Sequence, residues 1–538
     1  MKFFNTAGPV NCEKHYCLSP LDRFELDAIK SLINQEKYFV LHAPRQTGKT
    51  TCLLALMDCL NKEGKYKCLY INVESAQSAR EDVYRGIRAI LNEMGSRARI
   101  YLKNSYIKET WKDVLDKGGE DIALNEVLTL WTEESTKPII LLMDEIDSLV
   151  GDMLISVLRQ LRSGYDRRPD SFPQSVILCG VRDVRDYRIH SSREKTIITG
   201  GSAFNIKAES LRLGDFTKDE VNILYNQHTK ETGQMFKPES IDLVWELTNG
   251  QPWLVNVLAY EACFKIKEGR DLAKPITKSM IEQAKDNIIL RRDTHIDQLM
   301  DKLREERVKR VVNPMLQGLD MEHASEDDIQ YVLDLGLVTK SPQGLQIANR
   351  IYREVIPRHL TVTAQYNLES RIDPLWYIGS NGRIDMEKLL SAFQEFFREH
   401  SEHWIERFQY KEAGPQLLLQ AFLQRIVNSG GRVEREYGLG RMRTDLLVIW
   451  QIHGPEVRGQ RSGVEQMQRV VIELKLLHKS LETTIKEGLS QTAKYMDRCG
   501  TSDGNLIIFD RREDITWDEK IFRRLEKCKN KEIVVWGM

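Results

Sequence analysis

A short loop at residues 43–50 carries the most recognisable chemistry in this chain. An apolar run at 38–43 is followed by a turn and then by Gly48-Lys49-Thr50, which opens a helical pattern. The backbone N–H groups of such a loop and the helix N-terminus converge on one point, where a polyanion fits. Lys49 would reach the terminal phosphates, and the Thr50 hydroxyl would bind Mg²⁺. The predicted phosphate-contacting residues are Ala43, Pro44, Arg45, Gln46, Thr47, Gly48, Lys49, Thr50 and Thr51.

One position departs from the pattern G-x-x-x-x-G-K-[ST], because Ala43 stands where the first glycine is expected. Alanine tolerates a sharp backbone bend less freely than glycine. A chance Gly-Lys-Thr in a basic loop is the alternative. Strand, loop and helix follow in the order that the motif requires, so we interpret the segment as a phosphate-binding loop.

Two carboxylates follow the next apolar run, at residues 138–143. A continuous apolar run is typical of a strand buried on both faces of a parallel sheet. Asp144 is placed to hold Mg²⁺ through water, and Glu145 is placed to orient and deprotonate the attacking water. The alternative is a solvated acidic turn after a strand. We favour the Mg²⁺ site, because the phosphate-binding loop at Lys49 lies upstream in the same chain.

These residues resemble AAA-type P-loop ATPases, the group related to Orc-like and STAND ATPases of bacteria and archaea. The resemblance covers about residues 1–270. It implies an ATPase core that binds ATP with Mg²⁺ and that carries a helical lid. In related ATPases a lead-in such as residues 1–25 packs near the adenine. No trans-acting arginine finger is recognisable, so oligomeric assembly stays open. Further supporting segments are 203–206, 216–220 and 248–255, the last with a Gly-x-Pro turn that opens a lid helix.

A third apolar run covers residues 175–181 and ends at Arg182. In P-loop ATPases with an extra strand between the two motif strands, the end of that strand carries a polar sensor of the γ-phosphate. The resemblance therefore implies this role for Arg182. A surface ion pair of Arg182 with Asp183 or Asp186 is an alternative that the sequence leaves open.

A second constellation of charged residues lies on two expected strands near the C-terminus. Asp445 begins one strand, and Glu473 and Lys475 share one face of the next because side chains alternate along a strand. If the strands pair, Asp445 can approach Glu473. Two adjacent carboxylates repel each other and favour a bound cation such as Mg²⁺, which prefers oxygen ligands. Such a metal can polarise a phosphate and generate hydroxide, while Lys475 holds the water or offsets charge.

This arrangement resembles the PD-(D/E)XK nuclease superfamily over about residues 415–515. Thr444-Asp445 stands where the family has Pro-Asp, and Glu473-Leu474-Lys475 matches (D/E)-x-K. Gln491 and Tyr495 match the Gln-x-x-x-Tyr of RecB-like members. The family tends to carry an upstream acid, for which Glu436 is the nearest substitute, since helix 415–428 offers only Gln416, Gln420 and Gln424. A small α/β domain with charged strand ends is the alternative.

The elements that must position these residues indicate an α/β multidomain protein. A chain of 538 residues exceeds one hydrophobic core, so about two to four domains are expected. Residues 1–270 form the predicted ASCE-type ATPase with its lid. Residues 271–365 form a winged-helix-like unit, because a helix at 326–335 precedes two short strands about a polar turn. A helical linker region covers 366–414, and the restriction-endonuclease-like domain covers 415–538.

The amino-acid composition indicates the class of protein and the cellular compartment to expect. The apolar share of 41% and the charged share of 29% are typical of a soluble globular chain, and the net charge of -1 indicates no overall basic surface. Nine dispersed cysteines predict reduced thiols in a cytoplasm. No apolar run approaches the ~20 residues that span a bilayer, so no membrane partner is expected.

Two functional hypotheses follow from these patterns. The first is an ATPase coupled to an Mg²⁺-dependent nuclease with DNA as the favoured substrate. The nuclease resemblance further implies a role in defence against foreign DNA or in mobile-element biology. The second is a signalling or scaffolding ATPase whose nuclease-like domain is catalytically silent.

Overall fold

The fold is described from a computed structural model of the chain. The chain divides into two compact units, residues 1–299 with 325–352 and residues 300–324 with 353–538, and each is described by itself. The described residues are 1–183, 188–191, 196–199, 201, 204–291, 294–317, 324–342, 344–356, 377–379, 381–407, 419, 422–423, 431–436, 445–452, 467–477, 480–510, 512 and 515–538.

The first unit is built on a five-stranded parallel sheet in which β6 lies between β3 and β5. The predicted phosphate loop follows β3, and the predicted carboxylates follow β5. Because the strands are parallel, their carboxyl ends lie along one edge of the sheet, where α/β proteins bind ligands. In sheet order the strands are β4 (Lys67–Asn72), β5 (Ile139–Asp144), β6 (Ser175–Gly180), β3 (Tyr38–His42) and β9 (Lys207–Arg212).

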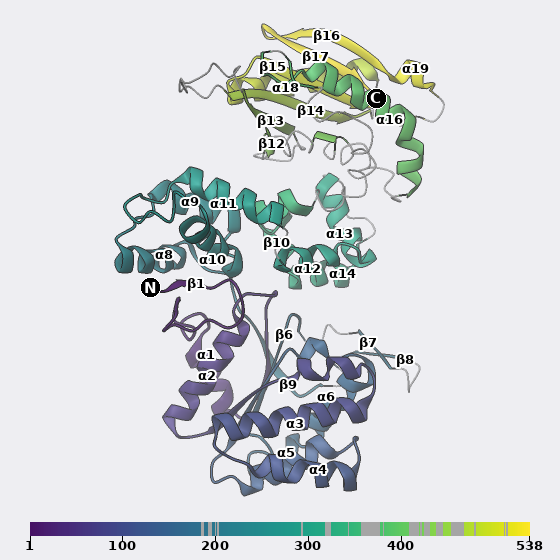
Figure 1. The fold of residues 1–538 in the computed structure, drawn as a ribbon. Coiled ribbons are helices and arrows are strands. Elements are labelled where there is room, and N and C mark those ends of the chain that lie inside the picture. The colour runs from purple at the N-terminus through teal and green to yellow at the C-terminus, as the bar shows by residue number, and fades with distance from the viewer. Residues whose placement is uncertain are drawn as a thin grey trace. The chain divides into compact units, whose positions relative to one another are not determined.

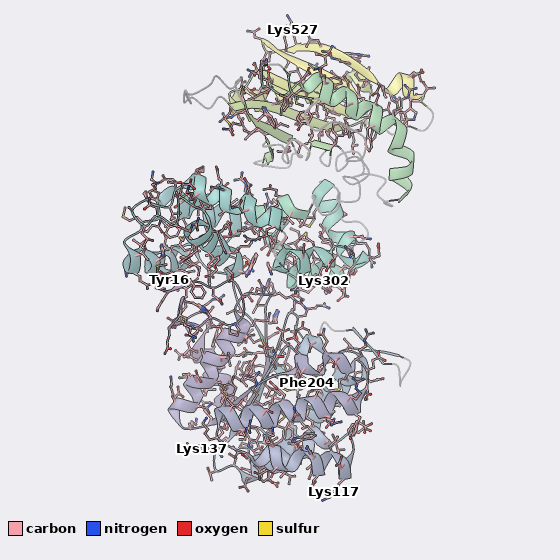
Figure 2. The ribbon with its side chains drawn as sticks, viewed as in Figure 1. Tyr16, Lys117, Lys137, Phe204, Lys302 and Lys527 are labelled. Atoms are coloured by element: carbon pink, nitrogen blue, oxygen red, sulfur yellow. A yellow bond between two sulfur atoms is a disulfide. The ribbon has the colours of Figure 1, made fainter. Side chains whose placement is uncertain are left out.

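Helices cover both faces of this sheet (Figure 1). The strands are apolar on both sides, as expected for a buried parallel sheet. Alternate strand residues therefore feed two separate cores, one of which contains Phe204, labelled in Figure 2. One face packs on α1 (Leu26–Asn34) and α2 (Lys49–Glu63), and the other on α3 (Val83–Tyr101), α4 (Tyr106–Gly118), α5 (Ala123–Glu134) and α6 (Gly151–Ser163).

A group of helices follows the sheet, between residues 218 and 291. Helix α8 begins with a capping box formed by Thr217 and Glu220, and α10 begins with Pro252, whose missing N–H costs nothing at a helix start. The helices are α8 (Lys218–Thr232), α9 (Pro238–Thr248), α10 (Pro252–Tyr260) and α11 (Lys278–Arg291), with a π-helical turn at Glu261–Lys265.

The N-terminal segment is tied to these helices. Tyr16, labelled in Figure 2, places its hydroxyl 3.1 Å from Nδ1 of the buried His228 in α8. The prediction that all cysteines are reduced thiols is wrong at Cys12 and Cys17, which form a disulfide. β1 (Phe3–Phe4) pairs in parallel with β2 (His15–Tyr16). The chain turns just before β2, where the Lys14 and His15 amides donate to the Asn11 carbonyl, and the Cα atoms of the two cysteines lie 5.5 Å apart.

A helix followed by a hairpin completes the first unit. Helix α14 (Glu326–Asp334) begins at Ser325, whose side chain accepts a hydrogen bond from the Asp328 amide. Strands β10 (Val338–Ser341) and β11 (Gly344–Ile347) pair antiparallel, which confirms the two short strands expected there. The remaining elements of the first part of the chain are η1 (Val73–Ala79), η2 (Ile146–Ser148), η3 (Tyr165–Arg167), β7 (Arg188–Ser191), β8 (Thr196–Thr199), α12 (Thr294–Lys302) and α13 (Glu306–Gln317).

The second unit contains a six-stranded mixed sheet between two layers of helix. Strands β12, β13 and β14 are antiparallel neighbours, and β14 continues to a parallel β15 through α18. Helix α18 packs on one face, and α16 packs on the other. The elements are α16 (Met386–Arg407), β12 (Gly431–Glu436), β13 (Asp445–Gln451), β14 (Met467–Leu476), α18 (Leu481–Cys499), β15 (Asp503–Phe509), α19 (Trp517–Lys520), β16 (Phe522–Cys528) and β17 (Lys531–Gly537).

No helix in the described part of the chain is both long enough and apolar enough to cross a membrane. The domain boundaries at 270, 365 and 414 stay predictions. Of the expected helix at 415–428, the structure describes only residues 419, 422 and 423, which are helical, whereas Gln416, Gln420 and Gln424 lie outside the described residues.

Candidate functional site

The loop after β3 has the backbone of a phosphate cradle. Within residues 43–48 the φ angle is positive only at Gln46 (58°) and Gly48 (95°). Gly48 is the N-cap of α2, so the left-handed conformation at the helix start falls on the residue that adopts it without strain. Ala43 needs no left-handed backbone, and this explains why it can replace the expected glycine.

Lys49 is buried, with 6% of its surface exposed, and its ammonium group turns back onto the loop. Its Nζ donates to the carbonyl oxygens of Ala43 (2.9 Å) and Pro44 (3.0 Å). A triphosphate offers stronger acceptors than two carbonyls, because hydrogen bonds between charged groups are shorter and stronger. Lys49 is therefore positioned to exchange these carbonyls for phosphate oxygens.

The side chains predicted to hold Mg²⁺ meet at the carboxyl end of β5. Thr50 Oγ1 donates to Asp144 Oδ2 at 2.6 Å, and the Glu145 amide donates to Asp144 Oδ1 at 3.0 Å. Asp144 is fully buried. A hydroxyl and a carboxylate oxygen at the start of a phosphate-binding helix form a donor set that suits Mg²⁺ held together with substrate phosphates. The residues present therefore fit the metal that the motif implies.

Glu145 directly follows the carboxylate of Asp144 and has a left-handed backbone, with φ of 59°. Burial, and then the charge of Asp147, raise the pKa of Glu145, while Lys49 opposes the rise. A carboxylate with a raised pKa is a better proton acceptor, which is the property that a general base needs.

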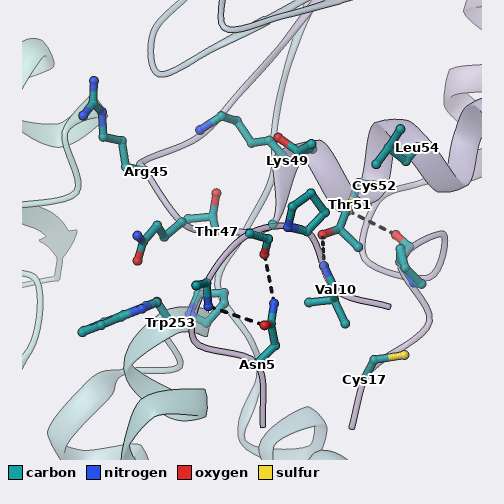
Figure 3. A pocket seen from close by; sticks show the side chains of 18 of the residues that line it. Asn5, Val10, Cys17, Arg45, Thr47, Lys49, Thr51, Cys52, Leu54 and Trp253 are labelled. Atoms are coloured by element: carbon teal, nitrogen blue, oxygen red, sulfur yellow. Dashed lines mark hydrogen bonds between the residues drawn. The ribbon is translucent and has the colours of Figure 1, made fainter. Parts of the chain in front are cut away.

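Lys49, Thr50 and Glu145 line a pocket of about 550 Å³, within the size range of ligand sites. The wall opposite the loop comes from the N-terminal segment and from Trp253 of α10 (Figure 3). The backbone N–H of Val10 donates to Thr51 Oγ1 at 3.0 Å, and Trp253 Nε1 donates to the carbonyl of Thr6 at 2.9 Å. The segment is thus joined both to the start of α2, at Thr51, and to α10, at Trp253.

Two pocket residues escaped the sequence analysis. Arg23 donates from Nη1 to the Thr47 carbonyl (2.5 Å) and from Nη2 to the Gly214 carbonyl (2.7 Å), so it joins the phosphate loop to the segment after β9. Tyr70, on β4, donates from its hydroxyl to Asp144 Oδ2 at 3.0 Å. Neither residue belongs to a short motif, and the only signal was Arg23 in the lead-in before the first helix.

Arg182 lies at the carboxyl end of β6, but its surroundings differ from the surface ion pair considered above. The residue is buried, and its partners lie on α14. Its Nε is 3.3 Å from Asp334 Oδ2, its Nη2 is 3.7 Å from Asp327 Oδ1, and the guanidinium lies 4.8 Å from the Tyr331 ring centre. Asp183 pairs instead with Lys207 at 2.5 Å, and Asp186 lies outside the described residues.

The same helix-and-hairpin segment reaches the phosphate loop. A Cβ atom at Gly336, where φ is 74°, would lie 2.8 Å from side-chain atoms of Pro44. The Arg212 Nη2 atom donates to the Leu333 carbonyl at 3.2 Å. Residues 325–352 therefore contact both the loop and the strand end that carries Arg182.

In the second unit, strand register brings three acidic positions into one row. Glu436 of β12 is paired directly with Asp445 of β13. Leu446 of β13 is paired with Ile472 of β14. The strands are antiparallel, so the preceding residue of β13, Asp445, lies opposite the following residue of β14, Glu473. The side chains of Glu436 and Asp445 lie outside the described part of the structure.

Glu473 and Lys475 form an ion pair on the α18 side of β14. Glu473 is 1% exposed, and its Oε1 lies 2.7 Å from Lys475 Nζ. Its Oε2 has no hydrogen-bond partner among the described residues. Burial raises the pKa of Glu473 to about 6, and the attraction of Lys475 limits that rise. A buried carboxylate oxygen that lacks a partner is costly unless a ligand satisfies it.

Gln491 and Tyr495 are half-buried on α18, the helix that packs against this face of the sheet. Their spacing places them one turn apart. Among the described side chains, no group of three or more His, Cys, Asp or Glu is gathered as a metal site.

Comparisons with known proteins bear on the first unit. The family model described as "AAA-like domain" matches residues 20–358. A search of curated proteins finds no match. Similar solved structures include a Walker-type ATPase of Pyrococcus abyssi, with 16% identity and a TM-score of 0.43, covering 66% of this chain and 99% of that one.

Two further structures are similar at lower scores. The RuvB Holliday junction branch migration motor of Thermotoga maritima has 11% identity and a TM-score of 0.32, covering 65% of this chain and 93% of that one. Cdc6p of Pyrobaculum aerophilum has 14% identity and a TM-score of 0.33, covering 64% of this chain and 93% of that one.

Proposed function

Because the chain belongs to the AAA-like domain family, we propose that its first unit binds ATP and hydrolyses it with Mg²⁺. The observation that carries the proposal is the hydrogen bond from Thr50 to the buried Asp144 at the start of the helix that Lys49 opens. This contact joins the phosphate loop to the carboxylate strand, as a shared Mg²⁺ site requires. The base and ribose of ATP would lie between the N-terminal segment and Trp253.

Each proposed role follows from a contact in the pocket. Lys49 leaves the carbonyl oxygens of Ala43 and Pro44 and binds the phosphates. Mg²⁺ held at Thr50 and Asp144 would neutralise charge that develops on the phosphates. Glu145 orients the attacking water and accepts its proton. Arg182 senses the γ-phosphate, for which it must exchange Asp334 for phosphate oxygens.

Two substitutions test this assignment with the full chain. Lys49→Ala should abolish binding of a fluorescent ATP analogue, because the ammonium group is the buried cation aimed at the loop. Lys62→Ala is the matched control, since it removes an exposed lysine from the last turn of the same helix, away from the pocket. Wild-type protein that neither binds nor hydrolyses ATP at any Mg²⁺ concentration would refute the proposal.

We further propose a metal-dependent nuclease in the second unit, acting on DNA. The register of Glu436, Asp445 and Glu473 supports this, as does the unsatisfied Oε2 of the buried Glu473 beside Lys475. The antiparallel pairing of β13 with β14, on which an approach of Asp445 to Glu473 depends, also supports the proposal. Mg²⁺ bound there would supply a hydroxide and polarise the phosphate.

Cleavage of DNA separates this proposal from a signalling ATPase with a silent second unit. Supercoiled and linear DNA would be incubated with the full chain, Mg²⁺ or Mn²⁺, and ATP, ADP or no nucleotide. Loss of cleavage in both Asp445→Ala and Lys475→Ala supports the nuclease, with exposed Lys527→Ala as the control. Intact DNA under every condition, together with ATP turnover, supports the signalling or scaffolding role.

A further inference from the structure

The carboxylate of Asp144 has an unusual third hydrogen bond from a neighbouring strand. Oδ1 accepts from the Glu145 amide, and Oδ2 accepts from both Thr50 Oγ1 (2.6 Å) and Tyr70 OH (3.0 Å). The amide and the threonine are part of the motifs that the sequence displays. Tyr70 belongs to neither motif, and it is 3% exposed.

Sheet register explains how Tyr70 reaches this carboxylate. Tyr70 of β4 is paired with Leu142 of β5, and Asp144 lies two residues further along β5, on the same face of the sheet. The long phenol ring therefore spans the distance from the Leu142 level to the end of the strand. Only a side chain with a polar group at its far end can make this contact from that position.

The ring of Tyr70 is held in place by packing and by α3. It belongs to the core beneath α2. Arg97 of α3 places its guanidinium 5.9 Å from the ring centre and is itself bound to Glu93 at 2.6 Å and to Tyr101 OH at 3.0 Å. A phenol keeps its proton near neutral pH and a carboxylate oxygen can only accept, so the Tyr70 hydroxyl is the donor in this contact.

We infer that Tyr70 is a positioning residue for Mg²⁺ in ATP hydrolysis, because its hydroxyl orients the Asp144 carboxylate, which would hold the metal through water. Thr50 alone cannot fix the carboxylate, since its oxygen is also the expected metal ligand. Donors on both oxygens, from the Glu145 amide and from Tyr70, set the plane of the carboxylate independently of the metal. Residues that orient metal ligands in this way change metal affinity when removed. The inference rests on the proposed ATPase function.

The test replaces Tyr70 by phenylalanine, which removes the hydroxyl and keeps the ring. Tyr66→Phe is the matched control, because Tyr66 belongs to the same core and donates its hydroxyl to Asn34 Oδ1 at 2.6 Å, away from the carboxylate. ATP turnover is measured at saturating ATP against the Mg²⁺ concentration. Binding of a fluorescent ATP analogue, both with Mg²⁺ and in EDTA, and thermal melting are measured beside it.

We expect Tyr70→Phe to need roughly 10-fold more Mg²⁺ for half-maximal turnover. Its affinity for nucleotide in EDTA and its melting temperature should match those of Tyr66→Phe. An unchanged Mg²⁺ requirement would overturn the inference, as would equal losses of nucleotide affinity with and without Mg²⁺. If Tyr70→Phe is insoluble, Tyr70→Leu replaces it. This variant loses the ring as well as the hydroxyl, and it should need at least as much additional Mg²⁺. Wild-type protein without ATP binding would instead refute the proposed function.

Discussion

Replacement of Glu473 by glutamine should stabilise the C-terminal sheet near neutral pH. Glu473 is buried, and its pKa is raised from an ordinary 4.5 to about 6. The folded protein therefore binds a proton at Glu473 more tightly than the unfolded chain does. Glutamine resembles the protonated carboxyl group, so Glu473→Gln removes the cost of ionising this side chain in the fold.

The size and pH range of the effect follow from the two pKa values. A rise from 4.5 to about 6 corresponds to about 2 kcal/mol between the two protonation states. The attraction of Lys475 is already contained in this net rise. Below about pH 4.5 the carboxyl is protonated in both states, so the substitution changes nothing. The gain develops as pH rises to about 6 and stays constant above it.

Hydrogen exchange measured by mass spectrometry suits this question because it resolves one region of a multidomain chain. The protection of β14 peptides, corrected for intrinsic exchange rates, would be compared at about pH 4.5 and 7.5. A gain of about 2 kcal/mol slows exchange roughly 30-fold at the higher pH. Glu482→Gln is the control, since that carboxylate on α18 has 79% of its side chain exposed.

Unchanged or weaker protection of β14 in Glu473→Gln at pH 7.5 would refute this reasoning. Divalent metal adds a second comparison in the same experiment. If Glu473 is a metal ligand, Mg²⁺ should increase the protection of β14 in wild-type protein but not in the variant. Equal effects of Mg²⁺ on both proteins would argue against a metal at this carboxylate.

Three further predictions concern the first unit. Glu145→Gln should keep ATP binding but slow turnover by at least about 100-fold, and wild-type turnover would show that the base lies elsewhere. Asp334→Asn should destabilise the nucleotide-free protein by about 3 kcal/mol, because it leaves Arg182 buried without that carboxylate. ATP should restore more of this stability than ADP in thermal melting, and equal restoration would contradict a γ-phosphate contact. Replacement of Cys12 and Cys17 by serine should weaken nucleotide binding up to about 10-fold, as the closed loop holds the N-terminal segment at the pocket. An unchanged dissociation constant would exclude that role.

Much of the candidate ATP site was predictable because its signals are local. Apolar strand, turn and helix follow one another within fifteen residues around Lys49, and Asp144 directly follows a buried run. The carboxyl ends of parallel strands lie along one edge of the sheet, so these two segments are expected to meet there. Alternation along one strand placed Glu473 and Lys475 on the same face, because the residues are contiguous. The pairing of β13 with β14 was only a condition at that stage, and the register supplied it.

Partners that are distant in the chain depended on the tertiary structure. Asp334 is 152 residues from Arg182, and Tyr70 is 74 residues from Asp144. The secondary-structure propensity of a segment does not reveal which distant segment packs against a strand end. The order of strands in the sheet and the packing of the helices decide which segments meet. By itself the sequence determined the two sets of charged residues and the strands that carry them. Only the packed fold decided that Arg182 is held by α14, that Tyr70 orients Asp144, and that Cys12 meets Cys17.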